Sequence, residues 1–429
     1  MGEQGVGSEV DTRGEEVERI QKRTVRVLLL SQATGGVGLV ATYIVTAVLA
    51  KSITHSRALA TVAAACLSIG AAAVSYPLSR QMSSKGRRVG LRTGYLIGAC
   101  GAIVALLGAI TRSYPILCLG VLGAGAGNAS NLATRYAATD LASPQRRART
   151  ISVVVWTTTI GSTAGSVISG FASNAGESLG LPAKGGSYLL SGLMFLLAAG
   201  IVEMLLRPDP LVVAGGIGKV TTHENRPRVM DSARLIWNNP TARVAAFAMI
   251  VCQVTMVGVM SLTPLHMDEG GQSQTVIGLM MAFHIWGMYL LSPVVGTLAD
   301  RIGHYPMLYI AGALCTAGAL WAATTPSDGR VGVFAGNFLV GLGWSFGIVA
   351  ASSLIVEQFP IEQRVGVQGV GDMAMIGAGA FAGVSSGALY SIFGYGGVNF
   401  GNAAFGILLI LATTATISAT RTKNAIPVS

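Results

Sequence analysis

Hydrophobic residues in this chain gather into long runs that are separated by short polar segments. Each run is close to the roughly 20 residues that a helix needs to cross the hydrocarbon core of a bilayer. The pattern predicts an all-α membrane protein with 12 transmembrane helices. We place these helices near residues 25–50, 57–78, 90–111, 114–137, 150–172, 187–206, 242–265, 274–297, 305–323, 331–356, 366–392 and 398–420.

The longest polar interruption divides the runs into two sets of six. It contains Pro208, Pro210 and the polar run from His223 to Arg228, so we expect no helix through it and interpret it as a flexible cytoplasmic linker. The predicted organisation is a cytoplasmic N-terminal tail (1–24), an N-terminal six-helix bundle (25–206), the linker (207–241), a C-terminal six-helix bundle (242–420) and a cytoplasmic tail (421–429).

The two sets of six are related to each other. Gly123 in the fourth run corresponds to Gly341 in the tenth, and the same spacing separates Arg146 from Arg364, each in a short loop before the next run. Two equivalent bundles predict a solute path between them near the middle of the membrane. This plan is much commoner among transporters than among enzymes or receptors, so we expect a transporter and no enzymatic activity.

The composition supports a membrane location and fixes the orientation. Only 11% of the residues are charged, against about 25% in soluble proteins. The net charge of +10 follows topology, because with cytoplasmic N- and C-termini nearly all Lys and Arg residues fall on the cytoplasmic side. We therefore exclude a nucleic-acid partner. The exceptions are Lys51, Arg57, Arg112, Lys184 and Arg330 outside, and Arg135 within a helix.

The five cysteines all lie in apolar runs and form no CxxC motif. We therefore expect neither a structural zinc site nor a disulfide framework, and no resident cofactor. The expected partners are the lipid bilayer and a small-molecule or metal-ion substrate, with the protein working as a monomer.

The segment from Gly296 to His304 reads GTLADRIGH between the eighth and ninth runs. Gly296 and Gly303 are expected to permit a tight turn, and Asp300 to accept hydrogen bonds from the free amides of a neighbouring helix N-terminus. Arg301 is expected to anchor the turn at the membrane face, with Glu357 at the end of the tenth helix as its partner.

This segment resembles the loop signature of the major facilitator superfamily, G-x-L-x-D-R-x-G-R/K-R/K. The resemblance implies the fold of that family, with two pseudo-symmetric six-helix bundles that rock about a central site. The corresponding loop between helices two and three departs from the signature, since Ser83 and Ser84 stand where the Asp-Arg pair is expected.

Sulfur and imidazole groups are concentrated in helices seven and eight. Seven of the 15 methionines lie between Met249 and Met288. Residues four apart share one helix face, and thioether, thiol and imidazole are the donors that select Cu(I) over hard cations. A packing stripe with a histidine bonded to a neighbouring helix is the alternative interpretation. The residues are Cys252, Met256 and Met260 on helix seven, and Met280, His284 and Met288 on helix eight.

The motifs M-x-x-x-M and H-x-x-x-M, formed by Met256, Met260, His284 and Met288, resemble those of bacterial copper-importing facilitators. This resemblance implies Cu(I) import across the bacterial plasma membrane, with Cys252 and Met280 as secondary donors. Since the same subgroup includes riboflavin and other organic-solute carriers, a carrier of riboflavin or a drug, including proton-coupled efflux, remains the alternative. That substrate would use Trp156, Trp286, Trp344 and Gln253.

Charged and amide groups also occur within the runs. Asn128, Asn131 and Arg135 share a face of helix four. Arg135 has three open interpretations, as a site for an anionic substrate, as a tie between the halves in the closed state, or as a side chain that reaches the cytoplasmic interface. Asp372, which the assignment places one turn into helix eleven, either carries a coupled proton or favours the helix N-terminus electrostatically.

Overall fold

The computed structural model describes residues 4–182, 184–217 and 228–425, and every regular element within them is a helix. The first half contains α1 (Gln4–Thr54), α2 (Arg57–Lys85), α3 (Arg87–Ile110), α4 (Tyr114–Ala137), the 3₁₀ helix η1 (Pro144–Arg146), α5 (Arg147–Ser178) and α6 (Gly186–Leu205). Then come α7 (Pro210–Val213), α8 (Val229–Asn238), α9 (Pro240–Glu269), α10 (Gln274–Tyr289), α11 (Ser292–Ile302), α12 (His304–Thr324), α13 (Arg330–Gln358) and α14 (Ile361–Ala425).

The prediction of 12 membrane spans is confirmed. Within the described ranges, eleven helical segments are long and apolar enough to cross a bilayer, and the last of them holds two spans. α14 breaks at Gly394, whose φ of 67° is in the region that favours glycine, so the chain turns there between the eleventh and twelfth spans. α10 and α11 together form the eighth span, which is interrupted just before Pro293.

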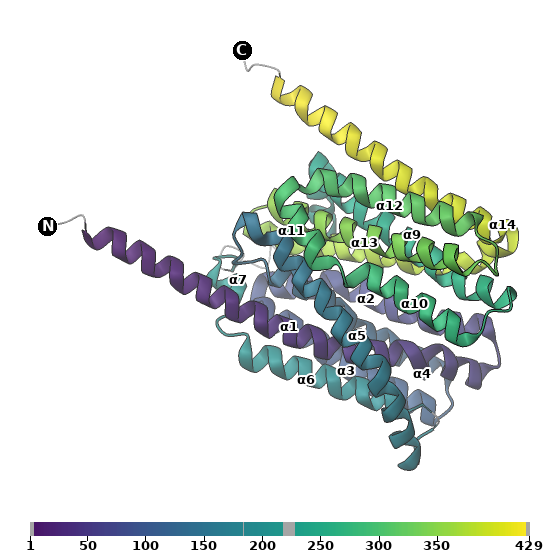
Figure 1. The fold of residues 1–429 in the computed structure, drawn as a ribbon. Helices are drawn as coiled ribbons and strands as arrows, with labels where there is room; N and C mark the ends of the chain where they lie inside the picture. The colour runs from purple at the N-terminus through teal and green to yellow at the C-terminus, as the bar shows by residue number, and fades with distance from the viewer. Residues whose placement is uncertain (1–3, 183, 218–227, 426–429) are drawn as a thin grey trace.

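The two halves lie side by side, with α1 to α6 in one and α9 to α14 in the other (Figure 1). The projecting ends of α1 and α14 point to the same side of the molecule, as an even number of spans requires. In each half the helices that are consecutive in sequence do not always pack together. α10, for example, packs mainly against α13, and α9 packs mainly against α14 and α13.

One prediction about the polar segments needs correction. The linker was expected to contain no helix, yet it carries α7 and α8. Asp209 accepts a hydrogen bond from the amide of Leu211 and so caps α7, while α8 buries Ser232 and Ile236 on one side. The N-terminal tail, for which the sequence predicted no secondary structure, is helical from Gln4 and continues directly into the first span. Residues 1–3, 218–227 and 426–429 of the predicted tails and linker lie outside the described residues.

Small residues set the distance between the helices of each half. A Cβ atom on Gly120 of α4 would lie 2.1 Å from the Ala105 backbone nitrogen of α3, and one on Gly101 would lie 2.3 Å from that of Ala124. At these glycines the backbones of α3 and α4 therefore touch, with no side chain between them. Membrane helices gain their association energy from such close packing, which accounts for much of the high glycine content.

The substitution Gly120→Ala should destabilise the protein by about 1–3 kcal/mol, because α3 and α4 must separate to admit the methyl group. We expect a lower unfolding temperature in detergent, measured by the loss of the monodisperse peak on size-exclusion chromatography after heating. Gly170→Ala in α5 is the matched control, since no atom lies within 4 Å of a Cβ built there. Equal unfolding temperatures for the two variants would contradict this account.

Candidate functional site

A first seam between the halves joins α5 and α11. Asp300 accepts hydrogen bonds from the amides of Ala148 at 3.1 Å and Arg149 at 3.0 Å, which are free at the start of α5. The amide contact predicted for Asp300 is therefore present, and it joins the two halves. Gly296 was expected to form part of the turn, but it lies inside α11. A Cβ built on it would meet the Ser152 hydroxyl at 2.0 Å. Gly303 alone makes the turn, with a φ of 84°.

A second seam joins α2 and α14 by the reverse arrangement. Here the glycine belongs to α14 and the serine to α2, with the Ser79 hydroxyl 2.0 Å from where a Cβ on Gly369 would lie. Ser83, which replaces the signature aspartate, bonds the Arg80 carbonyl of its own helix at 2.9 Å and makes no contact comparable to that of Asp300. The second seam thus relies on close packing alone at this point. In the first seam, close packing is supplemented by the Asp300 carboxylate, which caps α5.

Between the seams a buried ion pair joins the halves. The Arg135 guanidinium of α4 donates to Asp372 of α14 at 2.5 Å and to the Ser352 hydroxyl of α13 at 3.2 Å. The two charged side chains are 2% and 6% exposed, so the pair is almost completely removed from solvent. Arg135 therefore ties the two halves together, and its side chain does not extend to the cytoplasmic surface of the membrane.

The position predicted for Asp372 on its helix is wrong. α14 begins at Ile361, so Asp372 lies about three turns inside it, beyond the reach of the helix dipole, which falls off within the first turn. Its charge is instead balanced by Arg135.

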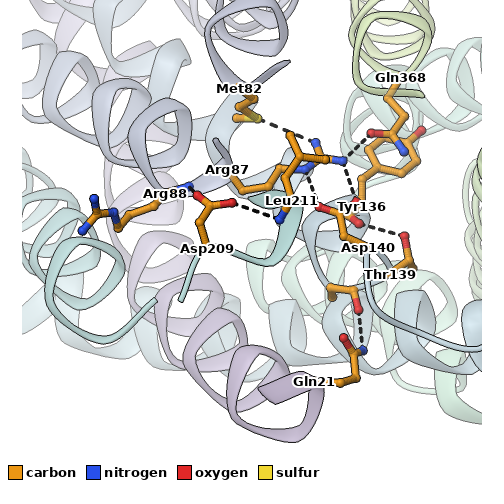
Figure 2. A network of polar contacts seen from close by, with 11 residues as sticks. Gln21, Met82, Arg87, Arg88, Tyr136, Thr139, Asp140, Asp209, Leu211 and Gln368 are labelled. Carbon is orange, nitrogen blue, oxygen red and sulfur yellow. Dashed lines mark hydrogen bonds and ion pairs between the residues drawn. The ribbon is translucent and has the colours of Figure 1, made fainter. Parts of the chain in front are cut away.

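A polar cluster nearer the cytoplasm extends this contact (Figure 2). Arg87, at the start of α3, donates to both carboxylate oxygens of Asp140 at 2.8 and 3.0 Å, and to the Gln368 side chain of α14 at 2.9 Å. Burial raises the pKa of the Asp140 carboxyl, against the opposing effect of the Arg87 guanidinium. Gln368 belongs to the other half, so this cluster is a further tie between the halves.

The second half contains a counterpart of this cluster. His304, which follows Gly303 as Arg87 follows Gly86, bonds Glu357 at 2.9 Å. Both pairs are separated by 53 residues in sequence. The predicted pairing of Glu357 with Arg301 is therefore wrong: Arg301 is exposed at the end of α11, and His304 at the start of α12 occupies the carboxylate.

All these contacts lie in the cytoplasmic halves of the spans and join or brace the two bundles there, so the cytoplasmic side is closed in this structure. The charged groups of the loop signature and its degenerate copy hold it closed together with two glycine contacts.

The sulfur-bearing stripes of α9 and α10 are largely buried. Met256 and Met288 belong to the main hydrophobic cluster, which extends through both halves, and Met260 is partly buried against it. Met280 does not join them, because it packs in a separate small cluster with Met267, Ile277 and Val333. A spacing of four residues predicts that side chains share one face of a helix, and this is why Met280 was grouped with Met288. The spacing does not predict that they lie at the same depth in the membrane.

Cys252 is also engaged elsewhere. Its thiol approaches the Gly343 carbonyl of α13 at 4.0 Å and interacts with Cys315 of α12. Among the described residues there is no group of three or more His, Cys, Asp and Glu side chains able to hold a metal ion. A soft-metal site would therefore depend on thioethers and a single imidazole.

That imidazole, His284, is fully buried in α10. Its Nδ1 lies 2.8 Å from the Asn337 backbone carbonyl of α13, which can only accept, so Nδ1 carries the proton. Nε2 is then left with a free lone pair, and it has no hydrogen-bond partner among the described residues. Metal-binding histidines characteristically donate their other ring nitrogen to a carbonyl in this way.

Helix α4 carries a second unpartnered polar group. Both amide atoms of Asn131 are buried without a hydrogen-bond partner within the described chain, next to Gly35 and Gly36 of α1. Asn128, one turn away, is partly exposed. The face predicted from their spacing thus divides into Arg135, which is paired, and two amides that are not.

An aromatic group lies near the middle of the membrane spans in the C-terminal half. Trp344 of α13 donates its indole N–H to the Gln253 side chain of α9 at 2.8 Å, and Tyr289 of α10 packs edge-on to it at 5.5 Å. Gly379 of α14 closes on Gln253, with 2.8 Å from a Cβ to the Gln253 Cγ. Trp286, in contrast, packs against Phe283 on an exposed face.

Several of these residues were not identified from the sequence. Arg87, Asp140 and Gln368 have no motif of their own, and the one signal that could have identified them is that Arg87 and His304 occupy equivalent positions directly after the turn glycines Gly86 and Gly303. Tyr289 had no signal of its own, since a tyrosine in an apolar run is unremarkable until its neighbours are known.

Comparison with known proteins gives consistent results. A family model described as Major Facilitator Superfamily matches residues 28–271 and 244–428. The uncharacterized MFS-type transporters YddS and YdeG of Bacillus subtilis are each 33% identical, over 401 and 396 residues, and each match covers 92% of this chain. These matches cover 91% and 92% of the relatives. The riboflavin transporter RfnT of Brucella anthropi is 27% identical over 387 residues, 88% of this chain and 92% of its own.

Solved structures share the fold at low identity. A bacterial homologue of the iron transporter ferroportin in an outward-facing state aligns with a TM-score of 0.72 and 14% identity, covering 93% of this chain and 99% of its own. The proton:xylose symporter XylE, bound to 6-bromo-6-deoxy-D-glucose, gives the same TM-score and identity, covering 93% and 96%.

The substitution Gly296→Leu should force α5 and α11 apart and open the cytoplasmic side. The buried Val365→Cys, between the halves, would report this opening through its alkylation rate in a cysteine-free background. Strain of about 1–3 kcal/mol on the closed state predicts an increase of at least about fivefold. Gly278→Leu, in open space on α10, is the control and should leave the rate unchanged. No increase for Gly296→Leu would show that this contact does not hold the side closed.

Proposed function

The chain belongs to the major facilitator superfamily, and from that membership we propose that it carries Cu(I) into the cell across the bacterial plasma membrane. Transport of a small solute by a multi-pass membrane protein follows from the family. The copper substrate, its inward direction and action as a monomer are proposals. One observation carries the choice of copper, namely the buried, unpartnered Nε2 of His284.

A free imidazole lone pair inside a membrane span is costly unless it serves a ligand. Met288 shares the face of His284 on α10, and this face packs against α13, where a Cβ on Gly341 would lie 2.5 Å from the His284 backbone carbonyl oxygen and 3.3 Å from the Met288 Cγ. Met256 and Met260 add thioethers from α9 to the same half. Imidazole with thioethers suits Cu(I) and gives no strong site for hard cations.

In the proposed cycle the ion binds while the cytoplasmic seams are closed. Release into the cytoplasm then requires the Asp300, Arg87 and Arg135 contacts between the halves to break. Inward movement of a cation is assisted by the membrane potential, by about 2.3 kcal/mol per 100 mV.

The second candidate substrate is a planar organic molecule. It is favoured by the Gln253–Trp344–Tyr289 group, which presents an indole, a phenol ring and an amide near mid-membrane on three different helices. The relative RfnT is named as a riboflavin transporter, and a flavin ring system would suit stacking on Trp344.

The copper proposal predicts that removing one donor lowers copper uptake. Met288→Leu keeps volume and loses the thioether, and His284→Gln keeps a donor for the Asn337 carbonyl while losing the imidazole. We expect cell-associated copper under copper limitation to fall by roughly tenfold or more.

Met280→Leu is the matched control for these variants, because it removes a buried thioether from the same helix but from the separate cluster. It should keep wild-type uptake. If Met288→Leu and His284→Gln both accumulate as much copper as the wild type, with equal amounts of protein in the membrane, copper is not the substrate.

The organic-substrate alternative predicts a different dependence. Trp344→Leu should reduce riboflavin uptake into a riboflavin auxotroph roughly 5- to 150-fold, the equivalent of about 1–3 kcal/mol of lost stacking, while leaving copper uptake unaffected. Trp321→Leu, which replaces a tryptophan on the exposed face of α12, should have no effect. Uptake no greater than in cells without the protein would eliminate riboflavin.

A further inference from the structure

The cytoplasmic extension of α1 separates its charges along the helix. Toward the membrane it carries only bases, whereas acids lie farther into the cytoplasm at Glu15, Glu16 and Glu18. This order suits a negatively charged membrane surface, which attracts the nearer charges and repels the farther ones. The membrane-proximal bases are Arg19, Lys22, Arg23 and Arg26.

A groove of about 790 Å³ lies between this extension and the loop that joins α4 to α5. Gln21 fixes the extension in place by donating to the Ala138 carbonyl at the end of α4 at 2.7 Å (Figure 2). The groove has apolar walls from Val17, Val25 and Leu141 beside its charged residues.

Three cations and one carboxylate face this groove. Lys22 is paired with Glu18 at 3.0 Å, and both side chains are largely exposed, so that pair is weak. Arg26 and Arg146 are exposed and form no close ion pair among the described residues, although Glu18 is near enough to Arg146 to interact with it electrostatically. Three cations against this one carboxylate still leave the groove with net positive charge. The groove therefore combines an uncompensated positive charge with an apolar wall at the cytoplasmic surface of the bilayer.

We propose that this groove binds an anionic phospholipid of the cytoplasmic leaflet. Its phosphodiester lies between Arg26 and Arg146, and its acyl chain runs along Val25 into the bilayer. Guanidinium groups bind phosphate oxygens through paired hydrogen bonds, and an anionic phospholipid matches both the charge and the apolar wall of the groove.

The bound lipid would connect α1 to the start of α5. That start is where the Ala148 and Arg149 amides hold Asp300 of the other half. An anionic lipid therefore stabilises the element on which the first seam depends. This inference is independent of the solute carried.

The test uses the full-length protein in detergent and native mass spectrometry. Phosphatidylglycerol and phosphatidylcholine with identical acyl chains are titrated, and bound lipids are counted. The wild type should retain phosphatidylglycerol preferentially. Arg26→Gln with Arg146→Gln should weaken that binding by about fivefold for each charge removed.

Arg80→Gln with Arg234→Gln is the matched control, since both residues are exposed, cytoplasmic and outside the groove. It should keep the wild-type preference. Equal retention of the two lipids by the wild type would overturn the proposal, as would unchanged binding in the groove variant. Displacement of phosphatidylglycerol by millimolar inorganic phosphate would show a free-anion site instead.

Discussion

The cytoplasmic side of this protein is organised around one buried ion pair. Arg135 and Asp372 come from different halves and are almost fully removed from water. Separating such a pair without hydrating it costs several kcal/mol, because each charge is left uncompensated in an apolar environment. The halves can therefore part only if water, a proton or a solute reaches these groups. Because of this requirement, the closed arrangement has a defined geometry, and partly separated arrangements are unfavourable.

The glycine contacts complement the pair. At Gly296 and Gly369 one helix backbone rests on a serine of the opposite half, so no larger side chain interleaves at these two points. Such contacts allow two rigid bundles to separate and meet again with little local repacking. Inside the first half, by contrast, α3 and α4 pack backbone to backbone, so these two helices move as one body.

The sequence predicted the spans well because apolar runs report directly on bilayer thickness, and Asp300 because its partner is any free helix N-terminus. It failed where the answer depended on how elements meet. Asp372 was assigned to a helix end because the preceding polar turn of α14 looks like a loop. Met280 has the same spacing as Met288, but periodicity says nothing about depth, and α8 is a short helix stabilised by the bundle it covers.

The two halves close their turn glycines with different chemistry. In the first half the partner of the carboxylate is Arg87, whose planar guanidinium holds both oxygens of Asp140 and also donates to Gln368 of the other half. In the second half it is His304, which bonds one carboxylate oxygen of Glu357 in its own half. A duplicated contact has thus diverged, since the first copy links the two bundles and the second links two helices of one bundle. The two bundles therefore contribute unequally to closure, and the N-terminal copy of the turn is the one that must let go of its neighbour when the halves part.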